Sequence, residues 1–187
     1  MNHYFTKDIL LVNNAFSKSK ELIECVTHIN QYEKSYISNN ANSYISNLRT
    51  SKEFTLDGSK YPSLNKFIED LTFSINKCYE IYKSYNQYVY GSIQYQYGLL
   101  KYDSSDYFRE HVDLIPGNII FQKRQLSVLV YLSSDYEGGE TRFNRQEIQI
   151  KPPAGSIALF PPFYTHPHSC EPILSGTKFV VVNWLLC

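Results

Sequence analysis

The stretch that decides the fold is RQLSVLVYLSSDYEGGETRFNRQEIQIKPPAGSIALF, residues 124–160. It contains short strand-like runs at 126–132, 147–150 and 156–160, and Gly, Pro, Asp or Ser residues separate them. Runs of this length and composition, bounded by turn residues, are typical of β-strands. Alternation of apolar and polar residues at 93–99 predicts a further strand, as do the segments 164–170 and 178–186. Short strands therefore dominate the second half of the chain.

The first third of the chain shows helical periodicity instead. Apolar residues recur at helical spacing between 22 and 29, behind Ser17 and Ser19, and either serine is suited to cap the helix. Pro62 is a favourable first residue for a second helix, because the apolar positions from 64 to 82 then follow one face for more than five turns. This second helix is the clearest local prediction in the sequence.

Helices followed by many short strands favour an α+β domain. With 187 residues the chain has the size of one domain, 1–187, in which we expect 1–86 to be mainly helical support and 87–187 to form the core of a barrel. Residues 35–60 are rich in Asn and Ser, which predicts a long irregular loop rather than a linker between domains.

The composition excludes several classes of protein. Lys+Arg and Asp+Glu number 18 each, so the net charge is zero and we expect no nucleic-acid partner. The aliphatic runs are far shorter than the roughly 20 residues of a membrane span, so no membrane association is expected. The first residues lack the pattern of a secretory signal, and the four scattered cysteines suit buried thiols in a reducing compartment. These features predict a cytoplasmic location.

A candidate metal site begins with His111 and Asp113. Side chains two residues apart on a strand point to the same face, so these two could bind one cation together. A third ligand is available from His166 or His168. Two imidazoles and one carboxylate form the facial triad that binds Fe(II) and leaves coordination positions open.

Three blocks of sequence together resemble one enzyme family. Tyr102 to Asp113 (YDSSDYFREHVD), Arg124 to Phe143 and Lys151 to Trp184 resemble, in order and in spacing, the motifs of the prolyl 4-hydroxylase-like branch of the Fe(II)/2-oxoglutarate-dependent dioxygenases. The resemblance covers residues 93–187. It implies a double-stranded β-helix (jelly-roll) barrel with the N-terminal helices packed on its outer face.

The resemblance also implies the identity of the metal ligands. It assigns His111 and Asp113 as two of them. The family's distal histidine lies four residues before a Pro, eight before a Gly and ten before a basic residue. His168 meets all three spacings and His166 meets none. We therefore expect the catalytic iron ligands to be His111, Asp113 and His168, with His166 as the alternative distal ligand or as a neighbour of the site.

The co-substrate residues follow in the same way. The resemblance implies that Lys178 pairs with the distal carboxylate of 2-oxoglutarate and that Tyr102 donates its hydroxyl to the same molecule. A dianion that enters a partly desolvated barrel needs a fixed cation at its far end, which agrees with Lys178. We expect Thr177 to face away from the pocket, and Trp184 to be either a core aromatic residue or a ligand contact.

Two further groups of residues have open roles. Arg109 and Arg124 flank the metal block and could reach a substrate, but structural or solvated ion pairs are the preferred interpretation for both. The tyrosines between 79 and 97 could line a groove for a proline-containing peptide, whereas packing over a sheet is the commoner role of such rings. We prefer the packing role for most of them.

The resemblance implies an enzyme that uses Fe(II), with 2-oxoglutarate and O2 as co-substrates and ascorbate as a further candidate cofactor. The expected reaction is hydroxylation of a peptide or protein side chain, with proline as the first candidate. The alternatives are hydroxylation of a lysyl residue, a free amino acid or another small molecule, or a non-catalytic metal-binding module on the same barrel. The sequence predicts no oligomeric state.

Overall fold

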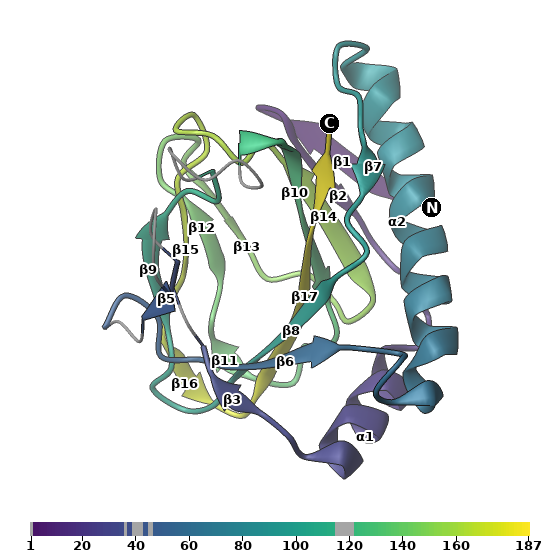
Figure 1. The fold of residues 1–187 in the computed structure, drawn as a ribbon. Helices are drawn as coiled ribbons and strands as arrows, with labels where there is room; N and C mark the ends of the chain where they lie inside the picture. The colour runs from purple at the N-terminus through teal and green to yellow at the C-terminus, as the bar shows by residue number, and fades with distance from the viewer. Residues whose placement is uncertain (1, 36, 39–42, 45–46, 115–121) are drawn as a thin grey trace.

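The computed structural model describes residues 2–35, 37–38, 43–44, 47–114 and 122–187. Two antiparallel sheets form the body of the molecule, and two helices lie along one side of it (Figure 1). Apolar side chains from the main sheet and the helices form the larger core cluster, and a second cluster lies around Tyr102, Tyr131 and Val180. The pairings below place the candidate site residues.

Within the described residues, the main sheet has nine strands. Its order is β1-β2-β14-β10-β17-β8-β6-β3, and β7 pairs with β17 beside β8. The strands are β1 (His3–Thr6), β2 (Ile9–Val12), β3 (Glu33–Lys34), β6 (Lys52–Leu56), β7 (Ser92–Ile93), β8 (Tyr97–Tyr102), β10 (Arg124–Tyr131), β14 (Ser156–Phe160) and β17 (Lys178–Leu186). The central strands β14, β10 and β17 are rich in buried aliphatic and aromatic residues, which suits a sheet covered on both faces.

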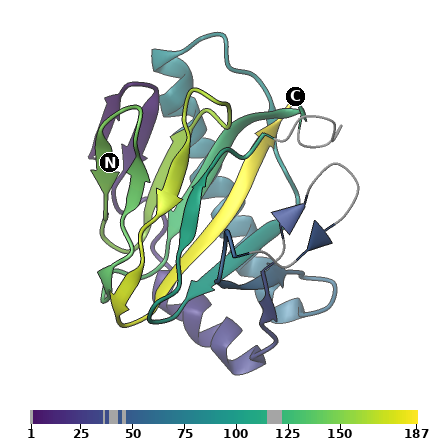
Figure 2. The same cartoon turned by 90° about the vertical axis from the view of Figure 1, so that its left-hand side faces the viewer.

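The minor sheet has four strands in the order β13-β12-β15-β9. They are β9 (Phe108–His111), β12 (Thr141–Phe143), β13 (Ile148–Ile150) and β15 (His168–Cys170). Two small ribbons complete the pairing: β11 (Glu137–Gly138) with β16 (Ile173–Ser175), and β4 (Ile37–Ser38) with β5 (Ser43–Tyr44). Figure 2 shows the minor sheet lying as a second layer beside the main sheet.

This two-sheet architecture agrees with the predicted jelly roll. Within the described ranges the two sheets remain separate hydrogen-bonded units, so the strands do not close into a continuous barrel. The strands predicted at 156–160 and 178–186 match β14 and β17 at both ends. The single-domain boundary of 1–187 stays a prediction.

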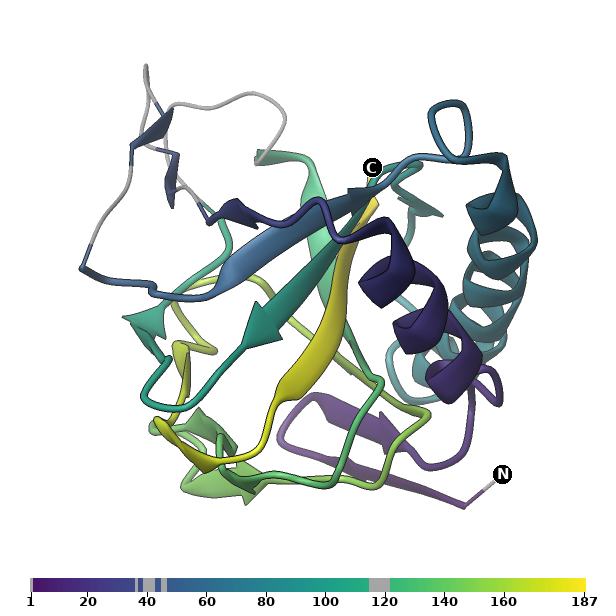
Figure 3. The same cartoon turned by 90° about the horizontal axis from the view of Figure 1, so that it is seen from below.

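The helices are α1 (Ser19–Ile29), the short 3-10 helix η1 (Pro62–Leu64) and α2 (Asn65–Tyr85). Leu22 and Val26 of α1 are buried, as is the predicted face of α2, which packs against the main sheet (Figure 3). Both predicted helices are confirmed, but the predicted cap of α1 is wrong. Lys18 precedes the helix and, among the described residues, no side chain caps it; the Ser19 hydroxyl instead donates to the carbonyl of Phe16 at 3.4 Å.

Two segments differ from the sequence prediction. Strand β6 lies inside the predicted 35–60 loop and pairs with β8, and its Phe54 and Leu56 are buried. Residues 36, 39–42 and 45–46 of that loop lie outside the described residues. The β1–β2 hairpin was also missed, although β2 pairs with β14 and is largely buried. The main sheet thus takes β1, β2, β3 and β6 from the region predicted to be mainly helical support.

The cysteines and tyrosines divide by exposure. All four cysteines are free thiols. Cys78 and Cys170 are buried as predicted, whereas Cys25 is only partly buried and Cys187 is exposed. Tyr79, Tyr82 and Tyr97 belong to the core. The other four of the seven tyrosines between 79 and 97, Tyr85, Tyr88, Tyr90 and Tyr95, are exposed, so the expectation that most of these rings pack is wrong. In the part of the chain that the structure describes, no helix has both the length and the apolar character needed to cross a membrane.

Candidate active site

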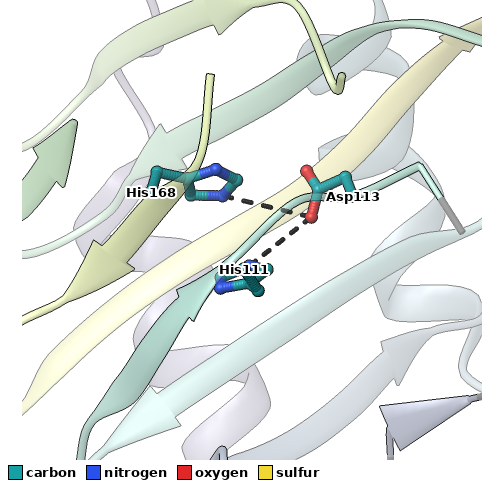
Figure 4. Close-up of side chains that lie close together, drawn as sticks. All are labelled: His111, Asp113 and His168. Carbon is teal, nitrogen blue, oxygen red and sulfur yellow. Dashed lines mark ion pairs between the residues drawn. The ribbon is translucent and has the colours of Figure 1, made fainter. Parts of the chain in front are cut away.

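Three side chains with metal-binding atoms converge between the sheets. His111 ends β9 and His168 begins β15, and the two residues are directly paired across these antiparallel strands. Asp113 follows β9. Its Oδ1 lies 3.6 Å from Nε2 of His111 and 4.0 Å from Nε2 of His168 (Figure 4). One ligand atom from each residue lies within 4.8 Å of the others. The structure therefore brings together the three residues predicted as metal ligands.

Backbone carbonyls hold both imidazoles in one tautomer. Nδ1 of His111 lies 2.8 Å from the carbonyl oxygen of Arg109, and Nδ1 of His168 lies 3.2 Å from that of His166. Because a carbonyl oxygen can only accept, each Nδ1 carries the hydrogen. Each Nε2 consequently presents its lone pair to the centre of the cluster, which is the arrangement that orients a metal-binding histidine.

The main sheet fixes the other oxygen of Asp113. The Ser127 hydroxyl donates to Oδ2 at 2.5 Å, and the indole N–H of Trp184 donates to the same oxygen at 3.2 Å. Ser127 and Trp184 are cross-strand partners of β10 and β17, so one register places both donors. Arg124 donates to the backbone carbonyl of Asp113 at 2.7 Å and lies 3.5 Å over the Trp184 ring. These contacts leave Oδ1 directed at the histidines.

The charges of the cluster favour metal binding. Burial works to raise the pKa of Asp113, but the imidazoles of His168 and His111 and the Ser127 hydrogen bond together hold it well below its usual range. Burial, reinforced by the neighbouring His111, lowers the pKa of His168 to about 4. At neutral pH the group therefore offers a carboxylate and a neutral imidazole, which are the protonation states that bind a cation.

The donor set fits Fe(II). Two imidazole nitrogens and one carboxylate oxygen constitute the facial triad of non-haem iron oxygenases, in which the remaining coordination positions stay open to other molecules. His111 and Asp113 are partly buried and His168 is buried, so the cluster is shielded from bulk water without being sealed. All three residues line one pocket.

Lys178 and Tyr102 line the same pocket from the main sheet. Lys178 begins β17 opposite Tyr102 of β8, and it is only 2% exposed. Its ammonium donates to the carbonyl of Gly139 at 2.8 Å and to Sγ of Cys170 at 3.3 Å. No carboxylate of the described residues lies within 4.0 Å of it. A buried cation without a counter-charge favours an anionic ligand.

Tyr102 is suited to donate a hydrogen bond in this pocket. It is 2% exposed, and its ring lies 5.7 Å from the ammonium of Lys178. Burial raises the pKa of the Tyr102 hydroxyl, so the group stays protonated at neutral pH. A protonated hydroxyl and an ammonium together offer donors to a carboxylate.

The other predicted residues separate into two groups. Trp184 lines the pocket and binds Asp113, so it contacts the site rather than serving only as a core aromatic residue. The Arg124 guanidinium has a structural role, but its contact with Asp113 is a hydrogen bond to the backbone carbonyl and not the ion pair preferred from the sequence. Arg109 is exposed and lies over the ring of Tyr107.

His166 and Thr177 lie outside the cluster. The metal-binding group found among the described residues does not include His166, whose ring nitrogens contact Thr165 and Lys7 instead. The Thr177 hydroxyl donates to Oδ1 of Asp103 at 3.3 Å, in agreement with the expectation that it faces away.

Sequence reasoning missed several residues in the pocket or in contact with its lining residues. Phe108 stacks on the His111 ring at 3.5 Å between centroids, and Arg49 lies over Phe108 at 5.1 Å. Ser127 and Cys170 contact Asp113 and Lys178. A serine inside the apolar run LSVLV was a signal for Ser127, because a hydroxyl in a buried strand needs a partner. Arg49 was hidden in the segment predicted to be a loop.

Comparison with known families agrees with this geometry. Residues 97–186 match the family model described as "2OG-Fe(II) oxygenase superfamily", a range that contains the triad, Lys178 and Tyr102. Over these 90 of its 187 residues, the chain is similar to this superfamily. The motif resemblance found in the sequence is thereby confirmed at the level of the family.

Curated relatives are similar over parts of the chain. A PKHD-type hydroxylase of Synechococcus sp. (strain CC9902) is 42% identical in an alignment of 67 positions, which covers 34% of this chain and 29% of the relative. Probable prolyl 4-hydroxylase 4 of Arabidopsis thaliana is 28% identical in an alignment of 124 positions, which covers 50% of this chain and 39% of the relative. The chain therefore spans well under half the length of these relatives.

Solved structures share the fold. A prolyl hydroxylase of Trichoplax adhaerens, in complex with a hypoxia inducible factor peptide fragment, superposes with a TM-score of 0.76 at 18% identity, covering 97% of this chain and 84% of that one. A Pseudomonas putida prolyl-4-hydroxylase gives a TM-score of 0.71 at 14% identity, covering 97% and 93%. The predicted jelly-roll fold with supporting helices is confirmed by these matches.

Proposed function

We propose that this chain is an Fe(II)- and 2-oxoglutarate-dependent dioxygenase that hydroxylates a side chain of a peptide or protein, with proline as the first candidate. One observation carries the proposal: His111, Asp113 and His168 line the same pocket as the buried ammonium of Lys178. A metal cluster and an anion-binding group in one pocket are what a chelating dicarboxylate needs.

The three cluster residues would hold Fe(II) through Nε2 of each histidine and Oδ1 of the aspartate. The bound iron supplies the oxidative chemistry, in which O2 and 2-oxoglutarate yield succinate, CO2 and one hydroxylated product. The chain itself orients the ligands through the carbonyls of Arg109 and His166. The partly buried pocket limits the access of water to the reacting groups.

Lys178 and Tyr102 would bind the co-substrate. The ammonium has three N–H groups. Two of them donate to Gly139 and Cys170, so one remains to donate to a carboxylate. The Tyr102 hydroxyl supplies a second donor from the neighbouring strand. In this low-dielectric pocket a charge-assisted hydrogen bond is stronger than in water.

The substrate assignment is supported by the relatives. Their names include PKHD-type hydroxylase and prolyl 4-hydroxylase, and one structural neighbour holds a peptide fragment. A peptide or protein with an accessible proline is thus the first substrate to test. Lysyl, free amino acid and other small-molecule substrates are the alternatives. The cytoplasmic location stays a prediction. The use of ascorbate as an added reductant also stays a prediction.

Succinate formation tests the proposal. Purified wild type is supplied with Fe(II), 2-oxoglutarate and O2, with and without proline-containing peptides, and is compared with His111→Ala, His168→Ala and His166→Ala. We expect the first two variants to lose succinate formation. Full activity in His111→Ala would refute the triad, and loss confined to His166→Ala would transfer the distal role to His166.

Mass spectrometry of the peptides identifies the substrate. A gain of one oxygen atom at proline supports prolyl hydroxylation, and a gain at lysine supports the lysyl alternative. Metal binding that depends on His111 and His168, without succinate under any condition, would indicate the non-catalytic module instead.

A further inference from the structure

We infer that the turn between β1 and β2 positions the distal metal-binding histidine, acting through His166. This inference rests on the proposed function, because it concerns the proposed metal ligand His168. It assigns a role in the site to the N-terminal hairpin and to a buried histidine outside the metal cluster.

His166 is a buried histidine with both ring nitrogens engaged. It is 4% exposed. Its Nε2 lies 2.9 Å from the carbonyl oxygen of Lys7, and its Nδ1 lies 3.0 Å from the hydroxyl of Thr165. Because the carbonyl can only accept, Nε2 carries the hydrogen and Nδ1 accepts from the hydroxyl. The ring is therefore a structural connection between the hairpin turn and the segment that precedes β15.

The backbone of the same residue orients His168. The carbonyl oxygen of His166 accepts the Nδ1 hydrogen of His168 at 3.2 Å. The contacts therefore follow one another. The carbonyl of Lys7 holds the His166 ring, the carbonyl of His166 holds the His168 ring, and Nε2 of His168 faces Asp113. Such partners of metal ligands fix ring orientation and raise metal affinity.

Further hydrogen bonds join the turn to the same region. The ammonium of Lys7 donates to the carbonyl of Gln146 at 2.5 Å, and the Gln146 side-chain amide donates to the carbonyl of Thr165 at 2.8 Å. Three segments distant in sequence are thereby connected around His166: the β1–β2 turn, the β12–β13 turn and the β14–β15 connection. This closed network restricts the displacement of the His166 backbone.

The turn holds an unfavourable backbone conformation. Thr6 pairs with Ile9, so Lys7 and Asp8 form a two-residue turn, with φ values of 48° and 60°. Such turns prefer Asn, Asp and Gly, and a non-glycine residue with positive φ is strained and persists only where its surroundings hold it. Here the Lys7 carbonyl accepts from His166 and the Asp8 carbonyl accepts from the Tyr82 hydroxyl at 3.0 Å. The contacts to His166 and Tyr82 compensate for this conformation.

The affinity for Co²⁺ tests this role without any turnover. Anaerobic titrations followed by Co²⁺ absorption compare the wild-type protein with His166→Leu and His166→Gln. Leucine removes the donor to Lys7, so we expect Co²⁺ affinity to fall by roughly 10- to 100-fold. Glutamine can place its amide near the position of Nε2 and should restore most of the affinity.

Matched variants separate positioning from loss of stability. Val26→Ala truncates a buried residue of α1, away from the site, and should lower stability while keeping the Co²⁺ affinity and spectrum of the wild type. If His166→Leu does not fold, Gln146→Leu takes its place, because it removes the donor to Thr165 and should also weaken Co²⁺ binding.

Each outcome decides between the two hypotheses. If His166→Leu folds and binds Co²⁺ with wild-type affinity, the inference is overturned and the proposed function stays intact. If His166→Leu does not fold, wild-type Co²⁺ affinity in Gln146→Leu has the same consequence. Failure of the glutamine variant to recover affinity also overturns it. Wild-type protein that binds Co²⁺ no better than His111→Ala overturns the proposed metal site, and the positioning role with it.

Discussion

Replacing Lys178 with methionine should stabilise the protein in the absence of 2-oxoglutarate and remove its response to that molecule. Methionine has nearly the length of lysine and no charge, so it fills the same space at the start of β17. Lys178 is 2% exposed, and none of the carboxylates in the described ranges lies within 4.0 Å of its ammonium. The site therefore holds a charge whose loss of hydration is only partly compensated.

The magnitude follows from the contacts of the ammonium. Burial of such an ion costs several kcal/mol, and replacement of buried ionic groups by apolar ones is often neutral or stabilising by about 1–4 kcal/mol. The variant leaves the Gly139 carbonyl without its 2.8 Å donor, which costs about 1–3 kcal/mol. It also loses the ammonium contacts with the Tyr102 and Tyr131 rings at 5.7 and 5.5 Å. The net expected gain in the free energy of unfolding is about 1 kcal/mol.

Urea unfolding of the Zn²⁺-loaded proteins measures both effects, because Zn²⁺ supports no redox turnover. At 2-oxoglutarate concentrations of about 100 times Kd, the wild type should gain about 2.7 kcal/mol and the variant none. The order of stability then reverses when the co-substrate is added. The single Trp184 next to Asp113 provides a fluorescence signal.

The matched control is Lys20→Met, because Lys20 is exposed. The stability of this variant and its response to 2-oxoglutarate should equal those of the wild type. A Lys178→Met protein that is several kcal/mol less stable than the wild type without ligand would contradict the account of the buried charge. A full stabilisation of that variant by 2-oxoglutarate would contradict the proposed co-substrate site.

Three further predictions follow from single residues. Ser127→Ala removes one of the two donors to Oδ2 of Asp113 and should weaken Co²⁺ binding by roughly 10-fold, as measured by anaerobic titration. Gly155→Ala places a Cβ 2.3 Å from a backbone carbonyl oxygen at a φ of +82°, so urea unfolding should show a loss of at least about 1–3 kcal/mol. Burial raises the pKa of the Cys78 thiol to about 12, so at pH 8 a thiol reagent should modify the exposed Cys187 and leave Cys78 intact until the protein is denatured. Rapid modification of native Cys78 would contradict its burial.

The elements that the sequence predicted well are those whose pattern is local. Helix α2 repeats its apolar face over 21 residues, and β14 and β17 are mainly apolar segments between turn residues. Strand β6 was missed because its five residues, KEFTL, lie in Asn- and Ser-rich surroundings. Its stability comes from pairing with β8, and a pairing partner distant in sequence leaves little local signal.

The candidate site shows the same division. The sequence predicted the three metal ligands, His111, Asp113 and His168, because strand periodicity and motif spacing can be read from neighbouring residues of the sequence. Ser127 was not predicted, because its role depends on the β10–β17 register that places it beside Trp184. The connection from Lys7 to His166 spans 159 positions and joins a turn to a strand-connecting segment, so only the folded structure places them in contact.

The two ends of the pocket belong to different layers of the fold. Both histidines are on β9 and β15 of the minor sheet, whereas Lys178 and Tyr102 are on β17 and β8 of the main sheet. With a diacid bound as proposed, one molecule would bridge the two sheets. The distance between the sheets would then determine which length of carbon chain fits. Selectivity against shorter or longer homologues of 2-oxoglutarate would then reside in the packing that separates the sheets, at positions that never touch the ligand.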